Sequence, residues 1–408
     1  MRPKPKLPYW VYIVSLLVPL VGFAISTRGP NMLDHIGAEY DSIARAIVAG
    51  RGFSDPFEVE SGPTAWMPPV LPILMAAGYW LADNDRMAVI AMFVGLQGIA
   101  IATTCLFVIR ESIRIGRVGW GLLILSVGIL VNFHTLFYFT HDHALLLLVS
   151  WVLFWIMTRW PSAPSGAIAV GCGVAGGIVA LCSPVMAAAW AVWTAVSWRA
   201  SIRSVAIAAF VSIAVISPWM IRNRVVLGRW VPIKSAGKFE LWQSMCLDND
   251  GVMDMFVMIQ HPWGKDNEAR RRYVELGEIA FIDTFDTETS EKFKTEPVDC
   301  LDRIANRFAS ATLFWEPLSA NAIPQTLRVV RSIVFVFPFL AMFVILLRTD
   351  RTLAKQESAA IWIYAAVLVP YVLISYYDRY AAPLIGIKML MVLYATASLP
   401  VSRRQPVP

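Results

Sequence analysis

Long apolar runs separated by short polar connections dominate the hydrophobic pattern of this chain. Runs of about 16 to 24 residues are long enough to cross the roughly 30 Å hydrocarbon layer of a membrane as helices. The pattern predicts about ten spans with both chain ends on one side. We place them at residues 9–26, 86–109, 118–138, 144–159, 165–182, 184–198, 204–221, 327–347, 359–376 and 381–399. Between the fifth and sixth, LCSP at 181–184 predicts either a tight hairpin or a kink within one longer element.

Two polar regions interrupt the apolar pattern. The first follows the first span. It contains a short helical pattern at 36–47, a glycine-containing segment GRGFSDPF after that pattern, and a rigid GPTAWMPP segment. The second is longer and contains helical patterns at 268–285 and 302–314. The predicted organisation is a transmembrane catalytic module at 1–221 with its first extracytoplasmic loop at 27–85, an extracytoplasmic segment at 222–326, and C-terminal transmembrane helices at 327–408.

Composition agrees with this pattern. Hydrophobic residues make up 57% of the chain and charged residues 16%, with a mean hydropathy of +0.58. An ordinary soluble domain has roughly 45–50% apolar and 25% charged residues. The net charge of +6 comes from short basic clusters between apolar runs rather than from one basic patch, which argues against a nucleic-acid partner. The predicted fold class is an all-α polytopic membrane protein.

The basic clusters also predict an orientation. Clusters at 110–117, 198–203 and 348–355 fall on the same side as the basic N-terminus, which the positive-inside rule assigns to the cytoplasm. The first span has no small-residue cleavage site, so we expect it to stay uncleaved. Most carboxylates and histidines then collect on the extracytoplasmic side. Cys246 and Cys300 lie there too, where they either pair or remain free thiols.

Three acids, Asp34, Glu39 and Asp41, lie in the first polar loop. A carboxylate that an apolar helix shields from water has its charged form destabilised, and it can act as a base on a hydroxyl or amine. For Glu39 we favour this role, because it shares a helix face with Ile43 and is expected to point inward. The alternative, in which the acids merely cap an interfacial helix, is preferred for Asp41 and suits Asp34.

Three of the five histidines, His134, His141 and His143, lie within ten residues, together with Asp142. Imidazoles near a carboxylate can ligate a divalent metal, so His141 and His143 are candidate metal ligands. Consecutive positions would splay such ligands around a helix, so the spacing does not match a metal site cleanly. For Asp142 we expect a polar role in the site.

Arginines stand at the extracytoplasmic ends of two predicted spans: Arg222 and Arg224 in SPWMIRNR, and Arg379, followed by Tyr380, in YYDRYAAP. Arginine on the translocated side opposes the usual charge bias, and a lipid phosphate would favour it through bidentate hydrogen bonds. The alternative is a side chain that snorkels at a helix end. Trp66 offers a flat ring at headgroup height, although an interfacial anchor explains it equally well.

Four segments resemble the GT-C membrane glycosyltransferases, near the bacterial group of aminoarabinose transferase and protein O-mannosyltransferases (glycosyltransferase family 39-like), in a branch distinct from those enzymes. They are GAEYDSIARAIVAGRGFSDPF with GPTAWMPPVLP, SPWMIRNRVVLGRWVPIKS, HPWGKDNEARRRYVELGEIAF and YYDRYAAPL. In that family the first loop bears the catalytic acid, a place that Glu39 occupies here. Better-known members carry an aspartate about three residues earlier, at Ile36, so Asp34 stays an alternative base. Ser183-Pro184 replaces an Arg-Pro pair of many relatives.

The resemblance implies a fold of GT-C type with interfacial helices in the first loop, located in a bacterial inner membrane with the active site facing the periplasm. The implied activity is inverting transfer of a sugar from a polyprenyl-phosphate donor to an extracytoplasmic acceptor, which is a lipid, glycan or protein. Cofactors are left open, with a divalent metal as one alternative. A transporter or flippase of lipid-linked sugars is the rival interpretation. Such proteins usually carry ionisable groups near mid-membrane and repeated halves, which this pattern lacks.

Overall fold

The computed structural model describes residues 7–26, 36–57, 59–138, 140–161, 164–247, 249–264, 267–318, 323–349 and 351–398. Within these residues the chain forms helices joined by turns and isolated β-bridges, and no strand. Several of the helices are apolar and long. The all-α architecture predicted from the sequence is therefore confirmed, and it fits a polytopic membrane protein.

Five helices of the described chain are long and apolar enough to cross a membrane. They are α1 (Tyr9–Ser26), α4 (Arg86–Arg114), α10 (Ile202–Leu227), α17 (Gln325–Leu346) and α18 (Lys355–Ile374). Each coincides with a predicted span. The other predicted spans correspond to shorter helices, so the structure does not support the predicted count of ten. These shorter elements are α5 (Val118–Val131), α6 (Phe133–Phe137), α7 (His143–Arg159), α8 (Gly166–Cys182), α9 (Pro184–Ser197), the 3₁₀ helix η2 (Asp378–Leu384) and α19 (Ile385–Thr396).

Local polar groups explain why several apolar runs break. α5 ends at Asn132, whose side-chain amide donates to the carbonyl of Gly128 at 2.8 Å. α8 and α9 are separate because Pro184 begins α9, and the Ser183 hydroxyl caps it by accepting from the backbone N–H of Met186. Proline suits the first position of a helix because that position needs no N–H donor. The run predicted as one span at 118–138 is thus divided into α5 and α6, whereas the break before α9 agrees with the separate spans predicted at 165–182 and 184–198.

The LCSP segment forms the tight hairpin, which decides between the two alternatives. Trp190 of α9 donates its indole N–H to Cys172 of α8 at 3.3 Å, and Thr194 lies 3.8 Å from the same sulfur. A side chain on Gly176 would collide with the Trp190 ring. These pairs lie symmetrically about Ser183, as expected for two helices that run antiparallel.

α8 packs closely on α10 through two glycines four residues apart. A Cβ atom on Gly173 would lie 2.6 Å from the carbonyl oxygen of Ala208, and one on Gly177 would lie 2.5 Å from Val215. Small residues at this spacing let helix backbones approach in a membrane, where dispersion contacts replace the hydrophobic effect as the main attraction. The glycine-rich sequence of α8 therefore serves this close packing.

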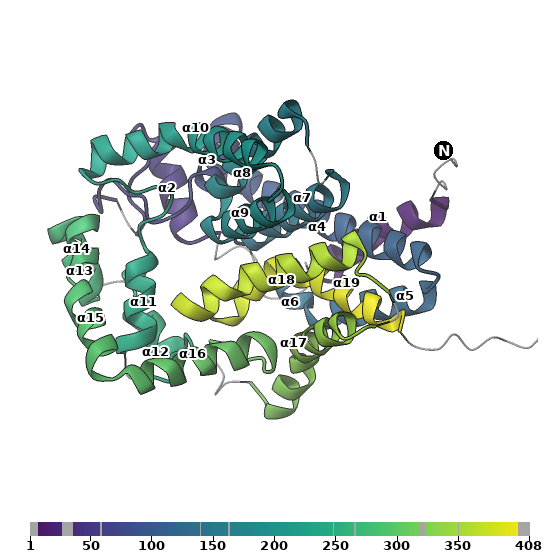
Figure 1. Cartoon of the computed structure of the whole chain (residues 1–408). Coiled ribbons are helices and arrows are strands. Elements are labelled where there is room, and N and C mark those ends of the chain that lie inside the picture. The colour runs from purple at the N-terminus through teal and green to yellow at the C-terminus, as the bar shows by residue number, and fades with distance from the viewer. Residues whose placement is uncertain are drawn as a thin grey trace, which may run out of the picture.

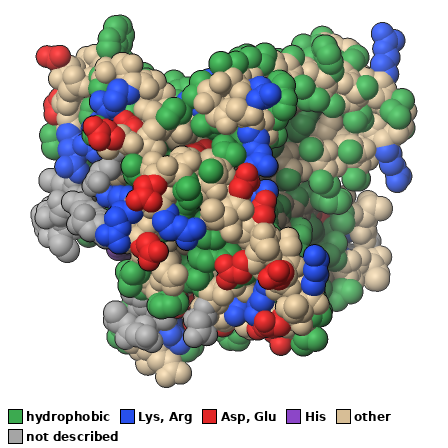
Figure 2. Space-filling view, turned by 90° about the vertical axis from the view of Figure 1, so that its left-hand side faces the viewer, with side chains coloured by type: hydrophobic (Ala, Val, Ile, Leu, Met, Phe, Trp, Pro, Cys, Tyr) green, Lys and Arg blue, Asp and Glu red, His purple; other side chains and the backbone are tan. Residues whose placement is uncertain are grey.

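The polar regions form their own helices at one end of the molecule. The first loop contains α2 (Glu39–Val48) and α3 (Val70–Leu81), and the long polar segment contains α11 (Gly237–Cys246), α12 (Met255–Ile259), α13 (Glu268–Leu276), α14 (Glu278–Asp283), α15 (Asp286–Thr295) and α16 (Pro297–Thr312). In Figure 1, helices α11 to α15 lie at the left, far from the N-terminus. Figure 2 shows basic and acidic side chains mixed over this end. The single helix predicted at 268–285 is divided at Gly277, whose φ of 74° suits glycine.

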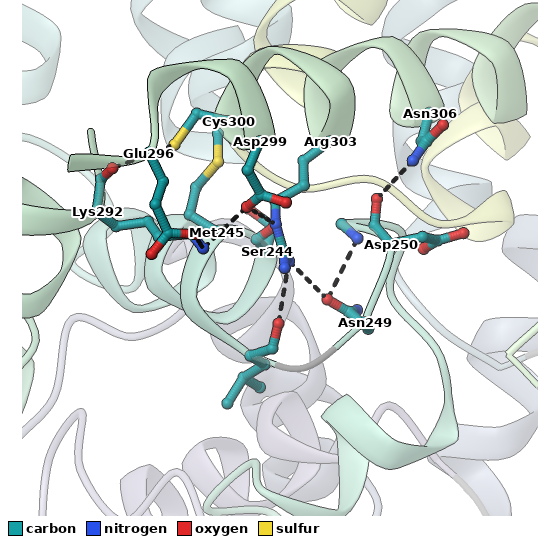
Figure 3. Close-up of polar contacts among 12 residues, drawn as sticks. Ser244, Met245, Asn249, Asp250, Lys292, Glu296, Asp299, Cys300, Arg303 and Asn306 are labelled. Carbon is teal, nitrogen blue, oxygen red and sulfur yellow. Dashed lines mark hydrogen bonds and ion pairs between the residues drawn. The ribbon is translucent and has the colours of Figure 1, made fainter. Parts of the chain in front are cut away.

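A network of charged side chains holds α16 to the loop after α11 (Figure 3). Arg303 donates to the carbonyl of Leu247 at 3.0 Å and to the side chain of Asn249 at 3.1 Å, and it pairs with Asp299 at 2.7 Å. Lys292 of α15 also contacts Asp299, at 2.9 Å. Cys300 belongs to the same helix, and both Cys300 and Cys246 are free thiols. Ion pairs rather than a disulfide therefore fix this part of the polar segment.

Arg307 attaches the polar segment to the end of α18. Its side chain is fully buried, and its donors reach the carbonyls of Val372 at 2.6 Å, Gly251 at 3.2 Å and Leu373 at 3.3 Å. Burial, together with the charge of Arg303, lowers its pKa to about 10, so the guanidinium stays protonated at neutral pH. Two of these carbonyls belong to the last turn of α18, where a cation interacts favourably with the helix dipole.

We expect Arg307→Met to destabilise the protein, because it leaves several buried carbonyls without a donor. The apparent melting temperature of the protein in detergent should fall by about 5 °C or more. Arg272→Met, at an exposed position of α13, is the matched control and should change it by less than about 1 °C. Equal melting temperatures for the two variants would show that Arg307 does not hold the segment.

Candidate active site

A cavity of about 660 Å³ lies where the polar helices meet the ends of the apolar ones. The first loop, the start of α7, the polar segment and η2 each contribute to its wall. Its charged and hydrogen-bonding side chains include Glu39, Tyr40, His141, Asp142, Lys234, Glu240, His261, Tyr377, Arg379 and Tyr380. The cavity thus gathers groups that are distant in sequence. Polar groups that converge in a cavity of this size are typical of ligand sites.

Glu39 is the first residue of α2, and the turn before it is strained. Gly37 and Ala38 have φ of 63° and 44°, and the N–H of Gly37 donates to the carbonyl of Thr140 at 2.8 Å. A non-glycine residue at positive φ costs energy, and such strain collects at functional sites. Burial raises the pKa of Glu39 above 4.5, against the opposing effects of its own backbone N–H, Arg379 and Lys234. Glu39 is therefore suited to accept a proton.

Asp142 is a second carboxylate in the cavity, in different surroundings. It accepts hydrogen bonds from the hydroxyl of Tyr40 at 2.9 Å and from His141 Nδ1 at 3.1 Å. Burial opposes its ionisation, but His141 and the charge of Arg379 outweigh this and lower the pKa of Asp142. The pKa of His141 is itself lowered to about 4 by burial and by Arg379, so we assign it as a neutral donor. The two carboxylates are thus shifted in opposite directions, a common arrangement for distinct acid–base roles.

Arg379 contributes a cation to the same cavity. It makes no hydrogen bond or ion pair with a described residue, its Nε is buried without a partner, and its guanidinium lies 5.0 Å from the ring centre of Tyr377. Burial works against its charge, whereas Tyr377 and Asp142 favour it and raise its pKa, so it stays cationic. A half-buried guanidinium whose Nε is shielded from water without a partner among the described residues favours an anion in the cavity.

The remaining charged groups of the cavity are largely balanced. Lys234 pairs with Glu240 at 2.5 Å. His261 lies 4.0 Å from Glu39, but its Nδ1 accepts the backbone N–H of Trp263 at 3.1 Å, which puts the ring hydrogen on Nε2. Burial, Lys234 and Arg379 lower the pKa of His261 to about 3. His261 is therefore neutral at physiological pH, and its contact with Glu39 is not an ion pair.

Of the arginines predicted to bind phosphate, only Arg379 is found among the described residues that line the cavity. Arg222 instead donates to the backbone carbonyls of Thr64 at 2.6 Å and Phe53 at 2.5 Å. Arg224 is exposed and donates to the carbonyl of Gly228. The structure therefore assigns to Arg222 the fixing of the first loop on α10.

Trp66 lines the cavity but is packed within an aromatic cluster rather than offered as a free ring. It is 1% exposed, and its ring centre lies 5.1 Å from that of Phe57 and 5.6 Å from that of His261. The segment before it is fixed by Glu278 of α14, which accepts from the Thr64 hydroxyl and from the backbone N–H of Ala65 at 2.8 Å. The polar segment thus holds the GPTAWMPP loop in place.

The other predicted site residues have mixed outcomes. Tyr380 and His141 line the cavity, whereas His143 is buried and is not among the lining residues. Asp34 lies outside the described residues. Lys234, Glu240 and His261 were not predicted, although Lys234 and His261 fall in segments that carry the family resemblance. No pattern within those segments distinguishes them from ordinary polar residues.

The histidines do not form a metal site with their described neighbours. In the described part of the chain, no group of three or more His, Cys, Asp and Glu side chains is arranged to hold a metal ion. The predicted ligands His141 and His143 thus lack a third ligand there. The divalent metal considered from the sequence gains no support from these side chains.

Comparisons with protein-family models, with curated proteins and with solved structures gave no match. The family resemblance therefore remains a prediction that rests on the four segments quoted above.

We expect Arg222→Ala to loosen the first loop, because the carbonyls of residues 53 and 64 lose a charged donor. Backbone amides of residues 53–66 should exchange hydrogen at least about tenfold faster, as measured by mass spectrometry. Arg224→Ala is the matched control and should leave this exchange unchanged. Identical exchange in both variants would mean that Arg222 does not fix the loop.

Proposed function

We propose that this protein is a membrane glycosyltransferase that moves a sugar from a polyprenyl-phosphate donor to an extracytoplasmic acceptor. The observation that carries the proposal is the cavity shared by Glu39, a buried carboxylate with a raised pKa, and Arg379, a cation without a partner among the described residues. A base and an anion-binding group in one cavity are what displacement of a phosphate leaving group needs.

In the proposed reaction, the acceptor hydroxyl attacks the anomeric carbon of the sugar. The new bond from acceptor oxygen to carbon forms as the bond from carbon to phosphate oxygen breaks, so the configuration inverts. Glu39 takes the acceptor proton. The leaving phosphate keeps the electron pair of the broken bond, and Arg379 stabilises its increased negative charge. Asp142 stays ionised and positions Tyr40 and His141 beside the reacting groups.

We further propose that the protein has the GT-C arrangement and lies in a bacterial inner membrane with the cavity on the periplasmic side. The short basic connections support this orientation, since α4 ends in Arg114 and α7 in Arg159. Mixed charges cover the end that carries α11 to α15 (Figure 2). The shorter apolar helices would then complete the spans by packing against the long ones.

Glu39→Gln should abolish transfer while leaving binding of the lipid carrier intact, because the amide keeps the shape of the side chain but cannot take a proton. We expect a loss of about 10²–10⁴-fold in transfer. Envelope glycolipids and glycoproteins are compared by mass spectrometry in a deletion strain that expresses each variant.

Binding of a polyprenyl phosphate to the purified protein is measured in parallel. Arg379→Met should weaken this binding by about tenfold or more.

Glu275→Gln, at an exposed position of α13, is the control and should restore the missing product fully. A flippase would tolerate Glu39→Gln, because moving the lipid requires no base. Full restoration of the product by the Glu39 variant would therefore contradict the proposed function.

A further inference from the structure

A second cavity, of about 260 Å³, lies between α5, α17, η2 and α19. Its walls are mainly apolar, and its lining includes four exposed side chains, Leu123 and Val127 of α5 and Ile333 and Phe337 of α17. α17 is one of the five helices long enough to cross a membrane, and exposed apolar side chains on such a helix and on the apolar helix α5 beside it are suited to face lipid. The cavity is therefore accessible to a lipid molecule from the side of the bundle.

Lys388 of α19 is the unexplained group in this cavity. Its side chain is 5% exposed, and its ammonium lies 4.1 Å from the centre of the Phe335 ring. Among the described residues it has no hydrogen-bond or ion-pair partner. A cation–π contact offsets only part of the cost of removing an ammonium group from water. An ionisable group inside a membrane-spanning bundle usually marks a functional position.

Arg331 adds a second cation to the same cavity. Its guanidinium stacks 4.0 Å from the centre of the Trp315 ring and donates to the Thr135 hydroxyl at 2.9 Å. Its Nε is buried without a partner in the described part of the chain. The acid that lines this cavity, Asp378, already accepts the indole N–H of Trp315 at 2.7 Å. Two cations and one acid leave the cavity with an excess of positive charge and unused donors.

We infer that this cavity binds an anionic phospholipid, with the phosphate at the Lys388 and Arg331 side chains and an acyl chain against the apolar wall. The ligand class follows from the site. An apolar wall open to lipid suits a hydrocarbon chain, and an ammonium without a hydrogen-bond or ion-pair partner among the described residues, beside a guanidinium with an unused Nε donor, favours an anion. The inference does not rest on the proposed function. It concerns a separate cavity, since Asp378 lines this one and Arg379 lines the other.

The test uses the full-length protein in nanodiscs made of phosphatidylcholine with increasing fractions of phosphatidylglycerol. Lipids that stay bound on release from the nanodisc are identified by native mass spectrometry. We expect the wild-type protein to retain phosphatidylglycerol in preference to phosphatidylcholine. Lys388→Met should reduce this retention by about tenfold or more, and Lys388→Arg, which keeps the charge, should preserve most of it.

Two further variants make the result specific to the cavity. Lys355→Met removes an exposed lysine at the start of α18 and should leave retention unchanged. Val127→Trp narrows the mouth with Lys388 intact and should reduce retention. Equal retention by wild type and Lys388→Met, or equal retention of both lipids, would overturn the inference. Displacement of phosphatidylglycerol by low concentrations of a polyprenyl phosphate would also overturn it, because the cavity would then belong to the sugar carrier.

Discussion

The hydrogen bond between the Tyr40 hydroxyl and the Asp142 carboxylate joins the first loop to the start of α7, and the geometry of the larger cavity depends on it. The adjacent bond from the Gly37 N–H to the Thr140 carbonyl sets the register of this contact. Together they place α2 so that Glu39 enters the cavity. Asp142 in turn is stabilised by these donors because it is a half-buried anion.

Two arginines near the cavity donate hydrogen bonds to backbone carbonyls and, among the described residues, not to carboxylates. Arg222 and Arg307 both donate to carbonyls, the first in the GPTAWMPP region and the second at the end of α18. Each arginine connects a polar segment to a long apolar helix through charge-assisted hydrogen bonds to carbonyls, and so holds in place segments that border the cavity. Arg379 differs, because its donors remain available for a ligand anion.

Local sequence patterns predicted where helices form and which polar residues line the cavity, but not which distant groups each side chain contacts. The helical pattern at 36–47 became α2, and Glu39, Asp142 and Arg379 line one cavity, because apolar periodicity and polar residues at span ends carry that information. The structure does not support the count of ten spans, because predicted spans such as 144–159 and 184–198 are helices shorter than the five that are long enough to cross a membrane, and the run at 118–138 is divided at Asn132. The role of Arg222 could not be predicted, since its acceptors are carbonyls more than a hundred residues away. Lys388 lies within the predicted span 381–399, and its burial beside Phe335 emerges only from packing.

The electrostatic coupling between Glu39 and Arg379 tests the shared cavity most directly. The pKa of Glu39 can be measured by infrared difference spectroscopy, with Glu39→Gln used to assign its carboxyl band. The account predicts a pKa above 4.5 in the wild-type protein. It predicts a higher value in Arg379→Met, because the carboxylate loses a nearby cation that stabilises it. A pKa of Glu39 that is the same with and without Arg379 would contradict the account.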